Sequence, residues 1–270
     1  MPRNKKYWED RFGNPNAKKE SYYHQLDLRG IDDLDDEGFA YFIAGVKGVN
    51  MLDLNETEIT NAGIRLLTGL EYVKEIRAKS CHLLDDGCVA DLNKITSLEF
   101  LHVRYTAITI DGLLKLNSLA NLKTLMFSAD DAEAIKEKLL QLKTMLPLCD
   151  LVIDAKPYYF NAVELFIHTI KKQPYTYRLK IKEQSLDAAW SNWLIDPGDN
   201  YIEAENQGPY SIDDIEWVEI NPVEKRSMGK LIAEKEIDHS EEMIKLLDYL
   251  SFPYMQSGQT ISAYLVKTEV

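Results

Sequence analysis

The segment LDLNETEITNAG, residues 52–63, contains the pattern on which the fold depends. It joins a short apolar stretch to a polar turn that ends in Gly63. Two further segments, IRAKSCHLLDDG at 76–87 and LHVRYTAITIDG at 101–112, can be superposed on it without a gap. Because strand side chains alternate between two faces, the opening triplet of each segment predicts a short strand with one buried face.

The strand pattern extends beyond these three segments. Apolar-x-apolar triplets lie at 26–28, 52–54, 76–78, 101–103, 125–127 and 151–153, so successive triplets begin 24 to 26 positions apart. Apolar residues at helical spacing, such as Ile64 and Leu67, follow the turn glycine. A fixed period in this range predicts strand-turn-helix units that stack and bury a shared core.

Two further columns of residues align when the repeats are superposed. Thr57, Cys81 and Thr106 occupy one column, and Ile59, Leu83 and Ile108 occupy another. Over residues 22–155 this pattern resembles the leucine-rich-repeat family, in the variant that has Cys or Thr where other members have Asn. The resemblance implies an α/β leucine-rich-repeat solenoid, with a short parallel sheet and helices on its convex side. It also implies that ligands bind against the outward strand residues.

The chain divides into three parts by composition. Residues 1–21 form a basic N-terminal segment or cap, residues 22–155 contain the repeats, and residues 156–270 form a small α+β module without a period. At the fifth unit the turn glycine is missing, and Asp130 or Asp131 is expected to cap a longer helix there.

Within the last part, polar and proline residues mark the ends of the expected elements. Asn161 is expected to cap a helix that Pro174 ends, and an alternating strand follows at 177–181. Pro-Gly at 197–198 and Gly-Pro at 208–209 predict turns between later strands.

The outward strand residues are the candidate partner-binding site. They combine aromatic, methionine and charged side chains, as the centres of protein interfaces do. The predicted set is Asp27, Arg29, Met51, Asp53, Glu75, Arg77, Phe100, His102, Arg104, Tyr105 and Met126. The alternative is that these are solvated strand residues whose charges pair across the sheet, such as Asp53 beside Arg77.

Charge and cysteine content narrow the classes of function. The net charge of −13 disfavours nucleic acid and anionic membranes and favours a basic protein partner. The three cysteines, Cys81, Cys88 and Cys149, are too few for a disulfide framework or a zinc site and are predicted to be buried thiols. The N-terminus has no apolar stretch of the kind found in signal peptides, so a cytoplasmic location is expected.

Catalytic motifs are missing from the sequence. It contains no Walker loop, dinucleotide fingerprint, HExxH, CxxC or GxSxG motif, and its histidines are scattered, so we expect no enzyme, no cofactor and no metal. The acidic residues Asp213, Asp214, Glu216 and Glu219 could bind a metal or a basic side chain. Strand alternation, however, places at most two of them on one face.

Together these observations predict a protein-protein interaction module. The leading hypothesis is an inhibitor or immunity-type protein that binds and occludes a basic partner, because an acidic surface accelerates association with a cationic target. The alternative is an adaptor or substrate receptor of a larger assembly, since repeats of this type also occur in ubiquitin-ligase receptors. A third hypothesis is an enzyme with an unrecognised site in residues 156–270.

Overall fold

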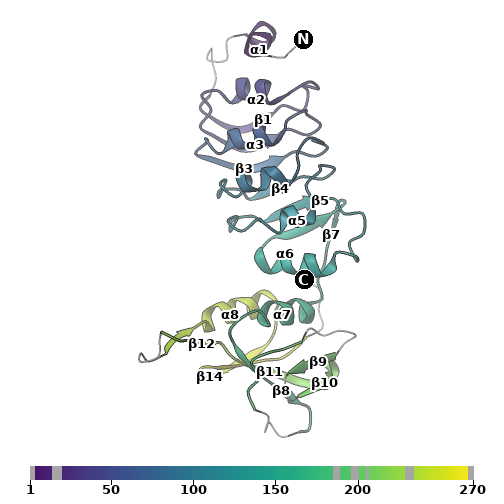
Figure 1. Ribbon diagram of the computed structural model, residues 1–270, viewed down its shortest axis with the longest axis vertical. Helices are drawn as coiled ribbons and strands as arrows, with labels where there is room; N and C mark the ends of the chain where they lie inside the picture. Colours follow the sequence, from purple (N-terminus) through teal and green to yellow (C-terminus); the bar gives the residue numbers. More distant parts are fainter. Residues whose placement is uncertain are drawn as a thin grey trace. The chain divides into compact units, whose positions relative to one another are not determined.

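A computed structural model describes residues 4–13, 20–184, 189–195, 201–204, 207–228 and 234–266. The chain forms two compact units, Met1–Tyr158 and Tyr159–Val270, which are traced in Figure 1. The turn expected at 197–198 lies outside the described residues. Within the described ranges, none of the helices has the length and apolar character needed to span a membrane.

The first unit is built on one seven-stranded sheet whose strands are neighbours in the order of the chain. They are β1 (Tyr22–Asp27), β2 (Gly48–Asp53), β3 (Tyr72–Arg77), β4 (Phe100–His102), β5 (Thr124–Phe127), β6 (Asp150–Ile153) and β7 (Lys156–Pro157). The strands β1 to β6 pair in parallel, and β7 pairs antiparallel to β6. Parallel neighbours need a crossover connection, which the residues between successive strands provide.

Short helices form these crossovers. They are α2 (Asp36–Ile43), α3 (Asn61–Leu67), the 3-10 turn η1 (Asp86–Cys88) with α4 (Val89–Leu92), α5 (Ile110–Leu113) and α6 (Lys136–Met145). Helices of consecutive crossovers contact one another and follow each other along the unit (Figure 1). Asp35, Thr60 and Thr109 cap α2, α3 and α5 by accepting a backbone N–H, which explains where these helices begin.

The fifth crossover differs from the expected one. The Asp131 carboxylate accepts the backbone N–H groups of Glu133 and Ala134 and so closes a turn before the helix. α6 then begins at Lys136 without a side-chain cap. Neither Asp130 nor Asp131 caps this helix, because the chain makes a separate turn first.

The core lies between the sheet and these helices. Leu52, Ile76, Leu101 and Leu125 are fully buried on the inner face of successive strands. Beneath the turns, the Thr57 hydroxyl and the Cys81 thiol both donate to the backbone oxygen of Leu54, at 2.7 and 3.0 Å. A small polar side chain is therefore needed at this column, because it satisfies a buried backbone acceptor.

Burial confirms one expectation about the repeats and corrects another. The three cysteines are buried and free, as expected. Leu83, however, is 55% exposed, while Leu84 is fully buried in the core. The gapless superposition is therefore wrong by one residue here, because in this unit the helix cap is Asp85, one position later than Thr60 and Thr109 in the other units.

The expected fold class requires correction. The first unit is a mostly parallel α/β sheet of seven strands that ends in an antiparallel one, and its arrangement is not established as a solenoid. The 24 to 26 residue period makes consecutive strands neighbours because the units are of nearly equal length. It does not set the curvature of a sheet, which depends on the relative widths of the strand and helix layers.

In its described residues, the second unit contains an antiparallel sheet of order β14-β15-β11-β8, the two-stranded sheets β10-β9 and β12-β13, and the α-helices α7 and α8. Its elements are α7 (Ala162–Ile170), β8 (Thr176–Ile181), β9 (Tyr201–Ala204), β10 (Gln207–Ser211), η3 (Ile212–Asp214), β11 (Ile215–Asn221), β12 (Val223–Arg226), β13 (Lys235–Asp238), α8 (Ser240–Tyr249), β14 (Tyr254–Ser257) and β15 (Thr260–Ala263). Asn161 caps α7 as expected, accepting the N–H groups of Val163 and Glu164. Alternation buries Tyr177, Leu179 and Ile181 on one face of β8.

The N-terminal helix α1 (Lys5–Phe12) packs on α2 through aromatic side chains, of which Phe12 lies 5.2 Å from Phe42 and Trp8 is the most deeply buried. Trp8 is fully buried, with its ring 6.0 Å from that of Phe12 and 6.2 Å from that of Phe42. Space for this ring exists because residue 38 is glycine: a Cβ at Gly38 would lie 2.5 Å from two ring carbons of Trp8.

The replacement Gly38→Ala is expected to displace Trp8 and to lower the free energy of unfolding by about 1–3 kcal/mol, the usual cost of overpacking. Helix propensity alone predicts the opposite sign, because alanine is favoured over glycine in a helix. Urea unfolding and the accessibility of the Trp8 fluorophore to iodide measure the effect. Gly69→Ala is the control, since its Cβ would meet only the Leu66 carbonyl at 3.5 Å. Equal stability of both variants would contradict the packing role of Gly38.

Candidate functional site

The pairing register arranges most of the predicted site residues in two rows on one face of the sheet. One row is Asp27, Asp53, Arg77, His102 and Met126, on β1 to β5 in turn. The second row contains Met51, Glu75 and Phe100 on β2 to β4. Arg29, Arg104 and Tyr105 follow the ends of β1 and β4. We call this surface, opposite the buried leucines and isoleucines, the outward face.

The outward face is acidic near β1 and β2. The Arg29 guanidinium contacts the Asp27 carboxylate at 2.7 and 3.0 Å, and its Nε lies 3.3 Å from Asp53 Oδ2. Hydrogen bonding to Arg29 lowers the pKa of Asp27. Asp53 is only 2% exposed, and this burial raises its pKa in spite of a hydrogen bond from the Asn55 backbone. Two neighbouring carboxylates therefore have opposite pKa shifts.

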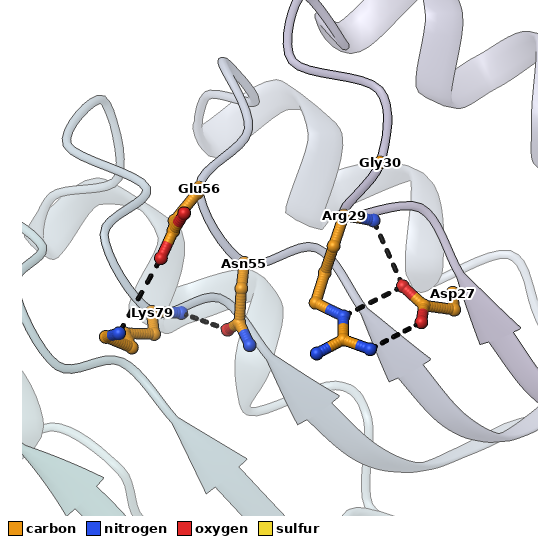
Figure 2. A pocket seen from close by; sticks show the side chains of 6 residues that line it. All are labelled: Asp27, Arg29, Gly30, Asn55, Glu56 and Lys79. Atoms are coloured by element: carbon orange, nitrogen blue, oxygen red, sulfur yellow. Dashed lines mark hydrogen bonds and ion pairs between the residues drawn. The ribbon is translucent and has the colours of Figure 1, made fainter.

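A pocket of about 680 Å³ lies at this end of the outward face, with Asp27 in its wall (Figure 2). It is lined by Asp27, Arg29, Gly30, Asn55, Glu56 and Lys79. The Lys79 ammonium lies 3.6 Å from Glu56, and the Lys79 backbone N–H donates to the Asn55 side chain at 2.7 Å. The charged groups of the pocket are paired with one another, Arg29 with Asp27 and Lys79 with Glu56. These pairs give no indication of a bound ion.

Asn55, Glu56 and Lys79 are also outward residues by the strand pattern, and each lies just after the end of β2 or β3. Glu56, Ser80 and Tyr105 share a left-handed backbone conformation, with φ of 64°, 58° and 57°. Glu56 and Ser80 each donate their backbone N–H to the next unit, and Tyr105 donates its own to the Ser128 hydroxyl. The turn thus fixes the direction in which Tyr105 leaves the sheet.

Cations and aromatic rings gather on β3, β4 and the residues after them. The Arg77 guanidinium lies 5.4 Å from the Phe100 ring centre and 3.2 Å from the Glu75 carboxylate. The Arg104 guanidinium lies 4.9 Å from the Tyr105 ring centre and donates to its hydroxyl at 2.9 Å. Stacking of this kind holds a guanidinium in place without neutralising it.

His102 lies half-buried among these groups, with its ring 6.4 Å from that of Phe100. Burial, and then the charges of Arg104, Lys79 and Arg77, lower the pKa of His102 to about 4. The Nε2 atom of His102 and the Nε atoms of Arg77 and Arg104 are buried without a hydrogen-bond partner. Buried polar atoms in native proteins are nearly always satisfied, so these three require an explanation.

The structure gives the acidic run of the second unit a structural role. Glu219 forms an ion pair with Arg178, and Glu216 lies 3.2 Å from Lys180, across the pairing of β11 with β8. Asp213 and Asp214 belong to η3 and not to the strand. In the described part of the chain, no group of three or more His, Cys, Asp or Glu side chains is arranged to hold a metal.

Comparison with known proteins gives a family match for part of the second unit. Residues 161–267 match the model of DUF6678, described as a family of unknown function. This match covers less than half of the chain. The match lies in a region for which the sequence alone suggested no resemblance.

Comparison with individual proteins points to subunits of a larger enzyme. "ATP synthase subunit s, mitochondrial" of Bos taurus and of Homo sapiens are each 32% identical over 114 residues, which cover 40% of this chain and 57% of theirs. The Mus musculus protein of the same name is 30% identical over the same length. The chain thus spans a little more than half the length of the relatives it matches.

These comparisons correct three expectations. The matching family is DUF6678 and the relatives are ATP synthase subunits s, so the assignment to the leucine-rich-repeat family is overturned. The description as an immunity-type protein falls with it, because these relatives are named as subunits of ATP synthase. The expected cytoplasmic location is overturned as well, since the relatives are named as mitochondrial proteins. A period of apolar residues constrains strand spacing, but many sequences can satisfy it, and it contains no signal of cellular location.

The opposite pKa shifts of Asp53 and Asp27 predict opposite effects of removing each charge. The raised pKa of Asp53 means that the folded protein holds its proton more tightly than the unfolded chain, so stability is lost as pH rises through the folded-state pKa. Asp53→Asn is therefore expected to gain stability relative to wild type as pH rises from the ordinary carboxyl pKa of 3.8 through the raised folded-state pKa. The lowered pKa of Asp27 reverses the sign, and Asp27→Asn is expected to lose stability relative to wild type as pH rises through the lowered folded-state pKa to 3.8.

Urea unfolding of both variants at a series of pH values measures these differences. At neutral pH, Asp53→Asn should be within about 1 kcal/mol of wild type, because a buried carboxylate is costly to desolvate. Parallel pH profiles for the two variants would contradict the assignment of opposite shifts.

His102 is expected to stay neutral at pH 5.5, where a histidine with an ordinary pKa is mostly protonated. Because its folded-state pKa is depressed, it favours folding above the unfolded pKa, and this stability is lost as pH falls from about 6.5 towards 4. Imidazole signals in NMR spectra report the protonation state directly. Arg104→Ala should raise the pKa of His102 by removing a nearby cation; an unchanged pKa would show that Arg104 does not act on it.

Proposed function

We propose that this chain is a non-catalytic component of a multiprotein assembly and that it binds a partner protein through the outward face of β1 to β5. The observation that carries the proposal is the row of stacked cations and aromatic rings on β3, β4 and the following turn. Arg77 stacks on Phe100 and Arg104 on Tyr105, and Tyr105 is 46% exposed. A few residues supply most of the binding energy at protein interfaces, and tryptophan, tyrosine and arginine are enriched among them.

The similarity to subunits of ATP synthase supports this proposal from another direction. A protein named as a subunit functions in a complex with other proteins, and part of this chain is similar to such proteins. We extend the role of an accessory subunit to this chain on that basis. ATP synthase of the organism that encodes the chain is accordingly the first assembly to test.

Two expectations from the sequence stay predictions. Occlusion of a partner, as by an inhibitor, is not addressed by the contacts on the outward face. A basic partner was expected from the net charge of −13, but the charges on this face are mixed in sign. The net charge of the whole protein affects how fast a charged partner approaches, whereas the residues on the outward face determine which groups it can contact.

A photo-crosslinking amino acid at Met126, on the outward face, is expected to label one protein in stoichiometric yield when the chain is added to purified ATP synthase or to an extract of its organism. The matched control carries the same amino acid at Leu66, an apolar position on α3 that is 37% exposed. Tyr105→Ala should weaken the complex by about 1–3 kcal/mol, as the loss of an interface aromatic residue does. Equal labelling from both positions, or none from Met126, would contradict binding through the outward face.

A further inference from the structure

The chemistry of the outward face becomes locally basic towards β4, although the whole protein is strongly acidic. We define the basic-aromatic cluster as Arg77, Lys79, Phe100, His102, Arg104 and Tyr105. His102 lies at the centre of the cluster. The charged groups that lower its pKa are Arg104, Lys79 and Arg77, and all three are cations. The carboxylates of Glu75 and Glu56 are engaged with Arg77 and Lys79 at the margin of the cluster.

Arg104 is the cation that lacks an anion. Among the described residues, no carboxylate lies within 4.0 Å of its guanidinium, whereas Arg77 and Lys79 each have one and Arg29 has two. Tyr105 holds the Arg104 group through its ring and its hydroxyl, so the guanidinium is oriented before any partner arrives. An oriented and uncompensated guanidinium is suited to a carboxylate, which accepts two parallel hydrogen bonds from it.

Hydrogen bonding within the cluster is also incomplete. The Nε atoms of Arg77 and Arg104 and the Nε2 atom of His102 lack partners in the protein, and each is buried. An unsatisfied buried group destabilises the free protein, and an acceptor of a partner could satisfy these atoms only after the side chains that cover them move. The same face presents Phe100, Met126 and Tyr105, which give a peptide apolar contacts beside the charges.

We propose that the basic-aromatic cluster binds a short acidic segment of the partner protein, with a carboxylate of that segment on Arg104. The inference rests on the proposed function and names the chemistry of the partner at that surface. The proposed segment is acidic, whereas the net charge led us to expect a basic partner. The difference arises because direct contact depends on the charges of the cluster and not on the charge of the whole protein. Extended polyanions fit less well, since the remaining surface of a protein with a net charge of −13 repels them.

A synthetic peptide of alternating acidic and aromatic residues is the probe, and the same peptide with Asn and Gln in place of Asp and Glu is its control. We expect the acidic peptide to bind the full chain, the amide peptide not to bind, and the affinity to fall about tenfold or more in Arg104→Gln, as for loss of one charge-assisted hydrogen bond. Arg65→Gln is the matched control, because Arg65 lies on α3 and pairs with Asp91. It should leave peptide binding unchanged.

NMR of His102 distinguishes binding at the cluster from binding elsewhere. A carboxylate next to His102 should raise its pKa, and the imidazole signals should shift in wild type and not in Arg104→Gln. Equal binding of the amide peptide, equal loss in Arg65→Gln, or equal displacement of the acidic peptide by inorganic phosphate would overturn the inference.

Different results would contradict the proposed function and the proposal of an acidic segment on Arg104. Labelling from Met126 without binding of the acidic peptide would overturn the inference about partner chemistry and leave the proposed function standing. Peptide binding that is lost in Arg104→Gln, with no labelling of any protein from Met126, would support the cluster as a carboxylate site and contradict the proposed assembly.

Discussion

The parallel ladder from β1 to β6 is the constraint on which the first unit depends. Each strand pairs with the next along the chain, so residues one repeat apart are direct neighbours. Asp27, Asp53, Arg77, His102 and Met126 therefore form a continuous row although they are distant in sequence. Any property of the outward face arises from this register, because a slip by one residue would exchange its side chains with those of the core.

The row places ionisable side chains side by side on neighbouring strands, where they are partly shielded from solvent. Asp53 is almost fully buried and His102 is partly buried, and burial is the largest influence on the pKa of each. The neighbouring cations then act on His102 with little screening. The outward face thus consists of an acidic part that is internally paired and a basic part that is incompletely paired, and this asymmetry underlies the proposed interaction.

Agreement between the sequence pattern and the structure varies from one feature to the next. Burial of the three cysteines and the cap at Asn161 follow from local rules that hold in most contexts. Leu83 and Asp131 were misassigned because one added or missing turn residue changes which side chain reaches the core or the helix. The family and the location could not be obtained from apolar spacing, because that spacing is compatible with unrelated proteins and carries no targeting information.

The sequence by itself determined that apolar triplets recur at 24 to 26 positions, that polar turns follow them, and that the period is absent from the last part of the chain. These are local properties, set by side-chain alternation and turn chemistry. Only the tertiary structure decided which charges are paired: Arg29 satisfies Asp27 and Asp53, whereas Arg104 has Tyr105 and, among the described residues, no carboxylate. The physical reason is that ion pairing depends on distances of a few ångströms between side chains, which register and rotamers set and which spacing in the sequence leaves open.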